Sequence, residues 1–465
     1  MTQGAKEQIE NNIQLLEEAH AEVLKALAGN EIAFVLELLE NCQAVAIQIG
    51  TVIEAFEGEG FVTVAILEEY CEQIFRIHGN LSQKQRMDDK ESDATETNGE
   101  EMNAKETNAV HVHLKELLTR VKESIQKDIK VRKEVVFLPY KAAMWDSLES
   151  VWMAADADPD CDTYVIPIPY FDKKPDGSFG EMHYEGNEYP KAVPVTDYND
   201  YNFELRRPDM IYIHNPYDEH NTVTSVHPFF YAKNLKQYTD CLVYIPYFVL
   251  DEIDPANRAA VEGMEHFVTV SGVIHAHKVI VQSEKMRQVY IDVMSREAGE
   301  QTRPIWEQKI FGTGSPKLDK VRRTKREDVE VPKEWLRILT KEDGSAKKVI
   351  LYNTSVSALL QYEEKMLSKI QRAFDIFQEH QEEVALLWRP HPLMKATIEA
   401  MRPRLWQAYE EIVEQYKKEG WGIYDDTPDM DRAIALCDAY YGDGSSLVQL
   451  CKEAGKPVMI QNVEV

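Results

Sequence analysis

The spacing of apolar residues divides the chain into two kinds of region. Up to about residue 84, apolar residues recur at intervals of three or four, which is the period of an amphipathic helix. Gly29 and Asn30 end the first such pattern, and Gly58 and Gly60 separate the second from the third. The predicted helices cover residues 9–27, 32–53 and 64–77. We therefore predict that residues 1–84 form a helical region that serves packing or binds a protein partner.

Residues 85–108 break this pattern, because they are rich in Asp and Glu and nearly free of apolar residues. Such a segment cannot bury enough surface to offset the entropy lost on ordering. We predict an acidic disordered linker here. A connecting helix over residues 109–133 follows, with Leu114, Leu118, Val121 and Ile125 on one face.

From residue 134, short apolar runs alternate with helical periods in two successive series. Such runs are typical of parallel strands that are covered on both faces. The runs are 135–138, 164–167, 210–213, 242–245 and 279–281, then 349–352, 385–388, 422–424, 438–441 and 458–460. The pattern predicts an α/β fold with two Rossmann-like domains facing each other, residues 134–320 and 321–465. Gly314, Pro316 and Asp319 mark a turn-rich hinge between them.

Composition narrows the class of protein. With 465 residues the chain is long enough for two or three domains. Its net charge of −28 disfavours nucleic acid as a partner. No run of about 18 apolar residues is found, so no transmembrane segment is expected. The six cysteines form no C-x-x-C pair, which favours a reduced, cytoplasmic protein. Peripheral contact with the inner membrane face stays open.

Candidate chemistry lies where strands of the second series end. Residues 440–446 read YYGDGSS, a Gly/Ser turn that leads from a strand into a helical pattern. Backbone N–H groups and the hydroxyls of Ser445 and Ser446 would point at one spot near the positive end of the helix dipole, which suits phosphate. Arg389 and His391 end another run, and the C-terminal ends of parallel strands meet in one crevice. We therefore expect an anion cradle, an arginine and a histidine in one site.

Within this site we expect Arg389 to bind a diphosphate and His391 to hydrogen-bond it or to protonate the departing phosphate. Asp443 could orient the turn, and Gln449 could reach a ribose hydroxyl. Asn353 and Thr354, at the end of the first strand of the second domain, could contact a phosphate or only cap the next helix. These alternatives stay open at this point.

The first domain offers weaker candidates. His214 follows the strand 210–213 and could act as a catalytic base, although a structural histidine is the alternative. Lys141 follows the first strand and could be a cation in the cleft or a solvated lysine. No metal site is expected, because the acidic run at 156–162 precedes a strand, where Asp and Pro commonly form turns.

The order of these motifs resembles that of the CDP-glycerol glycerophosphotransferases, teichoic-acid-type enzymes with the GT-B fold. The matching elements, which span about residues 134–461, are Gly314-Ser315-Pro316-Lys317-Leu318-Asp319, Arg389-Pro390-His391-Pro392, Asp443-Gly444-Ser445-Ser446 and Lys456-Pro457-Val458. The resemblance implies transfer of glycerol phosphate, or a similar alditol phosphate, from a CDP-activated donor. The acceptor would be a hydroxyl of a cell-surface glycan precursor or polyol phosphate, and no cofactor is implied beyond the donor.

One motif of that family is missing. Its W-H-G-T-P-x-K motif carries a second histidine, but the corresponding residues 242–249 read LVYIPYFV. Two alternatives therefore remain: a GT-B glycosyltransferase that uses a nucleotide sugar, and a non-catalytic relative that binds a nucleotide or a partner.

Overall fold

The computed structural model describes residues 1–91, 104–427 and 429–461. They form two compact units. The helical unit comprises Met1–Glu134, Pro159–Asp162 and Asn202–Asp209. The α/β unit comprises the remainder, including both Rossmann-like domains.

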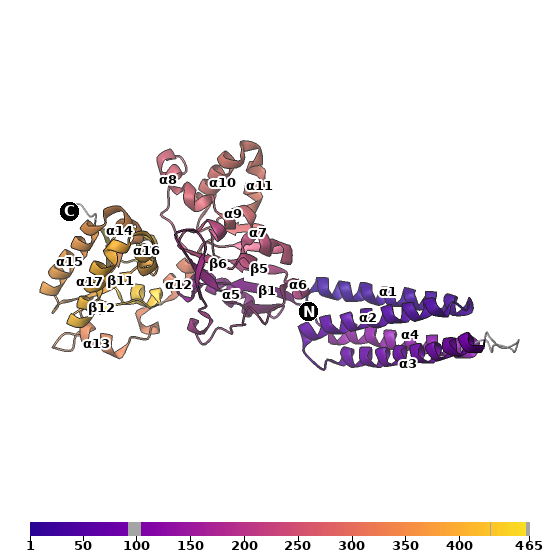
Figure 1. Ribbon diagram of the computed structural model, residues 1–465. Coiled ribbons are helices and arrows are strands. Elements are labelled where there is room, and N and C mark those ends of the chain that lie inside the picture. The colour runs from indigo at the N-terminus through magenta and orange to yellow at the C-terminus, as the bar shows by residue number, and fades with distance from the viewer. Residues whose placement is uncertain (92–103, 428, 462–465) are drawn as a thin grey trace. The chain divides into compact units, whose positions relative to one another are not determined.

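Four long helices make up most of the helical unit (Figure 1). They are α1 (Gln3–Ala28), α2 (Ile32–Glu57), α3 (Val62–Glu91) and α4 (Ala104–Asp128). Each packs against its sequence neighbours, and α4 also packs against α1, so the four helices surround one core. Ile9, Ile13 and Leu16 lie in this core because their spacing places them on one face of α1.

The helices on either side of the predicted linker extend into it. α3 continues to Glu91, and α4 begins at Ala104, so both flanks of the segment 85–108 are helical. Charged residues such as Glu and Lys are good helix formers, and packing of the preceding turns extends the helix into the acidic segment. The centre of the predicted linker, residues 92–103, lies outside the described residues.

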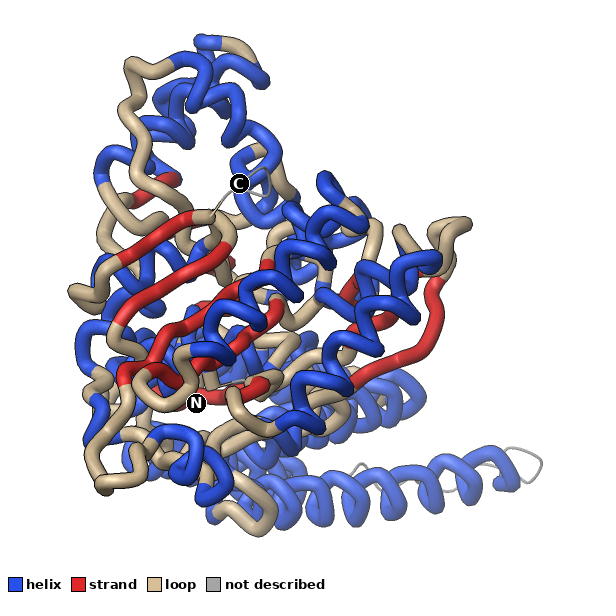
Figure 2. Tube along the Cα trace, turned by 90° about the vertical axis from the view of Figure 1, so that its left-hand side faces the viewer, coloured by secondary structure: helices blue, strands red, loops and turns tan. Residues whose placement is uncertain are grey.

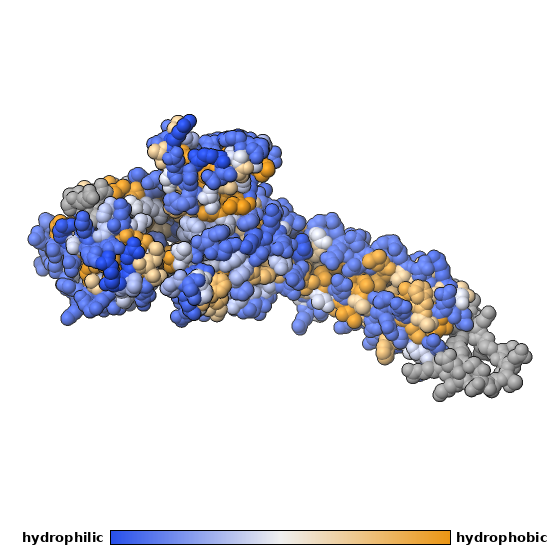
Figure 3. Space-filling view, turned by 45° about the horizontal axis from the view of Figure 1, so that its top comes forward, coloured by the Kyte–Doolittle hydropathy of each residue, from blue (hydrophilic) through white to orange (hydrophobic). Residues whose placement is uncertain are grey.

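Helix α2 is more apolar than its three companions. By length and composition it could cross a membrane, which the sequence analysis did not expect, and 28% of its most apolar window is buried. Phe34 and Ile47 on α2, together with Leu15 on α1 and Phe75 on α3, are exposed. Apolar atoms accordingly reach the surface of the bundle (Figure 3).

The first domain of the α/β unit is built on a six-stranded sheet. Its strands in spatial order are β2 (Cys161–Val165), β1 (Lys133–Leu138), β5 (Met210–Ile213), β7 (Cys241–Tyr244), β8 (Lys278–Ile280) and β9 (Ile310–Phe311). From β1 to β9 all neighbours pair in parallel. Its longer helices are α5 (Glu149–Asp156), α8 (Arg258–Val268), α10 (Glu284–Ala298) and α11 (Arg303–Lys309).

A small antiparallel sheet in the first domain was not predicted. It contains β4 (Phe179–His183), β3 (Tyr170–Lys173) and β6 (Thr224–Val226). The β3–β4 turn contains Gly177 with φ of +81°, and the amide of Lys174 donates to the carbonyl of Ser178. The residues Pro175-Asp176-Gly177 are a typical turn sequence, so a local signal for this hairpin was present.

The second domain is built on a five-stranded parallel sheet. Its strands in spatial order are β12 (Ile423–Tyr424), β11 (Val384–Pro390), β10 (Lys348–Thr354), β13 (Ala439–Gly442) and β14 (Val458–Ile460). Its helices are α13 (Lys333–Leu339), α14 (Val356–Tyr362), α15 (Glu364–Glu379), α16 (Met394–Met401), α17 (Trp406–Glu419), α18 (Met430–Leu436) and α19 (Ser446–Glu453). Helices lie on both sides of its strands (Figure 2).

Alternate residues of this sheet enter two separate cores. Leu351 and Leu387 belong to one apolar cluster, whereas Tyr352 and Trp388 belong to another. Both faces are therefore buried, as continuous apolar runs require. The predicted α/β class, with a GT-B-like pair of Rossmann-like domains and a helical N-terminal extension, is confirmed.

Helix α12 (Pro316–Arg323) connects the two domains and crosses the predicted boundary at residue 320. It packs against α5 in the first domain and against α18 and α19 in the second. Lys320 Nζ lies 2.8 Å from Glu149 Oε2 and 3.2 Å from Asp431 Oδ2, so one cation serves both domains.

Candidate functional site

Each parallel sheet changes direction once, and these two points define the candidate site. In the second sheet, the chain runs from β10 outward through β11 and β12, then returns to the other side of β10 as β13. In the first sheet, β2 and β5 lie on opposite sides of β1. Loops that leave adjacent strands in opposite directions open a crevice at the C-terminal ends of those strands, where ligands of α/β proteins bind.

Strands β10 and β13 approach closely at this point. Asn353 and Gly442 are paired across the two strands. Gly442 has φ of +137°, and a Cβ on it would lie 2.2 Å from the carbonyl oxygen of Asn353. Only glycine fits here, and it directs the chain into the turn that precedes α19.

Asp443 fixes the turn before α19 from its buried side. One carboxylate oxygen of Asp443 accepts the Ser355 amide at 2.7 Å, and the other pairs with Lys369. Both members of this ion pair are buried. Asp443 therefore orients the turn, as the sequence had suggested, and its engaged carboxylate does not fit a role in contacting the donor phosphates.

The top of the same turn is open. Ser445 caps α19 by accepting the Leu447 amide at 3.3 Å, and its hydroxyl donates to Asn353 Oδ1 at 2.9 Å. Ser446 is exposed at the first position of the helix. A Cβ on Gly444 would meet nothing within 4 Å. Gly444 and Ser446 thus border free space at the positive end of the helix.

Asn353 and Thr354 are buried and hold strands together. Asn353 Nδ2 donates to the carbonyl of Arg389 at 2.9 Å, and Thr354 Oγ1 accepts from Trp388 Nε1 at 3.2 Å. Their side chains are engaged inside the domain because both sit within β10. Neither fits the phosphate contact that was predicted; the cap of α14 is instead Ser355, which accepts the Ala358 amide at 3.1 Å.

Arg389 also differs from its expected role as a diphosphate ligand. It is buried, and its guanidinium donates to Asp425 Oδ2 at 2.5 Å and to the carbonyl of Thr427 at 2.7 Å. Arg389 is therefore engaged inside the domain, in a buried cluster in which Arg432 also lies 3.5 Å from Asp425 Oδ1. Gln449 is half-buried on α19 and donates to Glu453 Oε1 at 3.2 Å, one helical turn away.

Among the described residues, one ring nitrogen of His391 has no hydrogen-bond partner. Its Nδ1 accepts the Leu393 amide at 3.1 Å, which leaves the proton of the neutral ring on Nε2. The ring is partly exposed. Burial, with smaller contributions from Lys141, Lys317 and Arg389, lowers the pKa of His391 to about 4. The imidazole is therefore neutral at pH 7 and can donate a hydrogen bond.

His214 sits at the corresponding position of the first sheet but is locked. It is fully buried, its Nε2 accepts the Tyr140 amide at 3.1 Å, and its Nδ1 lies 2.8 Å from Ser147 Oγ. Burial, together with the charge of Lys317, lowers the pKa of His214 to about 3. With both nitrogens occupied, His214 joins β1 to β5 and does not fit the predicted role of catalytic base.

Lys141 is a cation at the C-terminal end of a strand of the first sheet. It follows β1, is 9% exposed, and its Nζ lies 4.4 Å from the centre of the Tyr170 ring. Burial lowers the pKa of Lys141, while Glu185 and Asp172 act in the opposite direction. Its charge also acts on His391, so the strand ends of the two domains are electrostatically connected. The sequence showed where Lys141 stands but not this environment.

The predicted hinge residues lie at the start of α12. Gly314 has φ of +129°, Pro316 is buried at the first helical turn, and Asp319 is half exposed, with one oxygen 3.5 Å from Ser150 Oγ. Sequence reasoning missed Lys317, whose Nζ donates to Asp146 Oδ2 at 2.8 Å in a buried ion pair. The motif's lysine was visible, but its partner stands 171 residues away.

Comparison with other proteins yields structural likeness alone. No protein-family model matches the chain, and no curated protein matches it either. The S. aureus protein MnaA solved with UDP is 11% identical, with 70% of this chain and 78% of that one covered and a TM-score of 0.42. A putative UDP-N-acetylglucosamine 2-epimerase from Listeria monocytogenes is 12% identical, with 72% and 81% covered and a TM-score of 0.42.

A UDP-forming trehalose-phosphate synthase from Burkholderia xenovorans is 14% identical, with 71% and 84% covered and a TM-score of 0.33. At identities and TM-scores this low, no property of these proteins is transferred to this chain. Because no family model matches, the resemblance to CDP-glycerol glycerophosphotransferases remains a prediction.

Proposed function

We propose that the α/β unit is a transferase that binds a nucleotide diphosphate donor where β10 and β13 end. The observation that carries the proposal is the direction change of the second sheet, with an open helix N-terminus on one side and His391 on the other. A donor diphosphate placed there would meet the amides of the Gly444–Ser446 turn and the Ser446 hydroxyl.

His391 has the tautomer and pKa for a role in group transfer. The neutral imidazole can donate a hydrogen bond from Nε2–H to an oxygen of the departing phosphate, and once the ring has taken up a proton from solvent it can transfer the Nε2 proton to that oxygen and return to the neutral form. An anionic diphosphate beside the ring would raise the pKa of His391 from its low value, which makes protonation easier once the donor is bound. Lys141, rather than Arg389, is then the cation that supports the diphosphate, because Arg389 is engaged with Asp425.

Of the two donor classes we favour a nucleotide sugar. Transfer of glycerol phosphate in the resembled family uses a second histidine, which residues 242–249 lack, and His214 cannot replace it because both ring nitrogens are bonded. The diphosphate cradle itself serves any nucleotide donor. CDP-glycerol is the second candidate, with a hydroxyl of a glycan or polyol phosphate as acceptor, and a site that binds nucleotide without turnover is the third.

The products separate these candidates. We expect the purified chain, supplied with UDP-, GDP- and CDP-activated donors and simple sugar or polyol acceptors, to release a nucleoside diphosphate from a nucleotide sugar. Release of CMP from CDP-glycerol would instead support glycerol phosphate transfer. Binding of a nucleotide without release of any product would remove the enzymatic proposal and leave a binding protein.

The location of the donor is tested by a charge placed at the cradle. Ser446→Asp puts an anion at the first position of α19, where the helix dipole tolerates it but a phosphate is repelled. We expect nucleotide diphosphate affinity, measured by calorimetry, to fall at least tenfold. Ser345→Asp adds the same charge to an exposed turn before β10 and serves as the matched control. Equal affinity in the two variants would place the donor elsewhere.

A further inference from the structure

The β3–β4 hairpin collects three metal-ligating side chains on one face. Tyr170 pairs with His183 across the two antiparallel strands. Residues two apart on a strand share a face, so Asp172 lies on the side of Tyr170, and Glu181 lies on the side of His183. The register of Tyr170 with His183 and Phe171 with Met182, continued by one residue, sets Asp172 opposite Glu181, and the pairing shifts only before Lys173.

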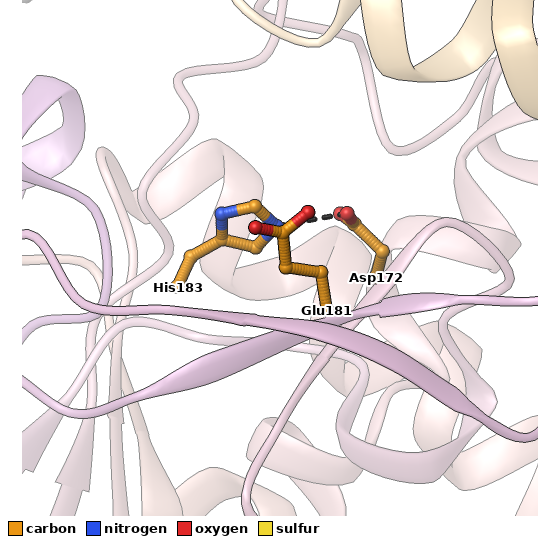
Figure 4. A group of neighbouring side chains, drawn as sticks. All are labelled: Asp172, Glu181 and His183. Carbon is orange, nitrogen blue, oxygen red and sulfur yellow. Dashed lines mark hydrogen bonds and ion pairs between the residues drawn. The ribbon is translucent and has the colours of Figure 1, made fainter.

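The ligand atoms of these side chains converge. One carboxylate oxygen each from Asp172 and Glu181 and one ring nitrogen of His183 all lie within 4.8 Å of one another. Figure 4 shows the three side chains rising from the hairpin and pointing toward one another. His183 Nε2 lies 2.8 Å from Asp172 Oδ2, and the His183 ring stacks on Tyr170 at 5.1 Å. The ring is thus fixed in place before any ligand binds.

The charges around this cluster are unbalanced. Glu181 is exposed, and among the described residues no hydrogen bond or ion pair engages it. Within the part of the chain that the structure describes, the carboxylate of Asp172 has one hydrogen-bond partner, the His183 ring. Glu185 is taken up by the Tyr170 hydroxyl and by the Ala142 amide, at 2.5 and 2.8 Å. Lys141 is the cation that acts on Asp172.

We propose that Asp172, Glu181 and His183 bind a divalent cation of the Mn²⁺ or Zn²⁺ class. One imidazole with two carboxylates is a ligand set that suits these ions, and it leaves at least one coordination position open for water or substrate. The cation would displace the proton that lies between His183 Nε2 and Asp172 Oδ2, and the neutral His183 ring would then carry its proton on Nδ1. Metal–ligand distances of about 2.0–2.2 Å require the three ligand atoms to close slightly, which the exposed Glu181 side chain allows by rotation.

The competing interpretation is a plain hydrogen-bonded His183–Asp172 pair beside a solvated glutamate. Such a pair gains little stability at a half-exposed position and has no use for Glu181. The two interpretations therefore differ in whether all three side chains act together.

Binding of Mn²⁺ to the full chain, freed of metal by a chelator, tests the site directly. Mn²⁺ is chosen because its preference for oxygen and imidazole ligands avoids the six cysteines. We expect one bound ion per chain by electron paramagnetic resonance titration, with affinity reduced at least tenfold in each of Asp172→Asn, Glu181→Gln and His183→Gln. These substitutions keep size and hydrogen bonding, and unchanged circular dichroism would show that the variants fold.

A matched control is available in the helical unit. His78 Nε2 lies 3.1 Å from Glu40 Oε1 in a histidine–carboxylate pair to which the described residues add no third ligand. His78→Gln should leave the Mn²⁺ titration unchanged. Absence of saturable binding in the unaltered chain, or loss of binding in His183→Gln but not in Glu181→Gln, would overturn the three-ligand site. Because the readout is metal binding alone, its failure is independent of the proposed transferase activity.

Discussion

The two sheets place a histidine after a strand at their direction changes, yet they use it in opposite ways. His214 follows β5 and is fully buried, with Tyr140 and Ser147 bonded to its two ring nitrogens. His391 follows β11, is partly exposed, and has one nitrogen bonded by Leu393. Position at a strand end therefore brings a residue to the right edge of the sheet, but neighbouring side chains and amides decide whether it faces a ligand.

The cations at the two strand ends also differ, but here it is the residue of the first sheet that remains available. In the second sheet Arg389 forms a buried ion pair with Asp425 inside the domain. In the first sheet Lys141 keeps its ammonium against the Tyr170 ring and acts on His391 in the other domain. The first domain thus contributes a cation and the second an imidazole.

The contrast between His391 and His214 would be contradicted if replacing either histidine had the same effect on turnover. We expect His391→Gln to lower turnover by about 10²–10⁴, because a positioned proton donor contributes that range, while donor affinity changes less. His214→Gln should keep turnover per folded molecule within a few fold. Steady-state kinetics on both variants, corrected for the folded fraction, provide the measurement. A larger loss of turnover in His214→Gln would reverse the assignment.

The close approach of β10 and β13 is the next feature to test. Gly442→Ala should lower the free energy of unfolding by about 1–3 kcal/mol, because the new Cβ meets the Asn353 carbonyl in a left-handed backbone conformation. Gly444→Ala, two residues on, enters open space and should stay within about 0.5 kcal/mol. Thermal or urea unfolding measures both, and equal losses would show that the turn is not built on glycine at 442.

The smallest expected effect is a pH dependence of stability. The pKa of His214 is lowered from 6.5 to about 3, so below pH 6.5 the unfolded chain takes up a proton that the folded chain refuses. Stability should fall as the pH drops through this window, by up to about 1.4 kcal/mol per pH unit for this group. His214→Gln should remove that part of the slope in urea unfolding at pH 7, 6 and 5. A slope that is unchanged in the variant would contradict the buried neutral imidazole.

Much of the fold followed from local patterns. The ten apolar runs all became strands, because burial on both faces selects continuous apolar segments whatever their partners. The exceptions carried weak signals: β9 has two residues, β3 and β4 are partly exposed strands with polar positions, and β6 is a buried strand of three residues, two of them polar. The turn sequence Pro175-Asp176-Gly177 was the one local signal that indicated the hairpin.

The site was less predictable, because its residues are defined by distant partners. Arg389 and Asp425 are 36 positions apart, and Lys369 and Asp443 are 74 apart. No spacing rule reveals that such charges neutralise each other inside a domain. The turn at 442–446 was recognisable because its glycines and serines act through neighbours in the sequence.

The ammonium of Lys320 is shared between Glu149 and Asp431, which belong to different Rossmann-like domains. Movement of one domain relative to the other therefore separates an ion pair. Burial together with the nearby Asp146 raises the pKa of Asp431 to about 6. If the second domain swings away, Asp431 loses both its counterion and this burial, and the pKa of its carboxyl falls toward the ordinary value. Opening of this joint is thereby coupled to acidity and screened by salt, so the solution around the protein helps to set how long the domains stay closed.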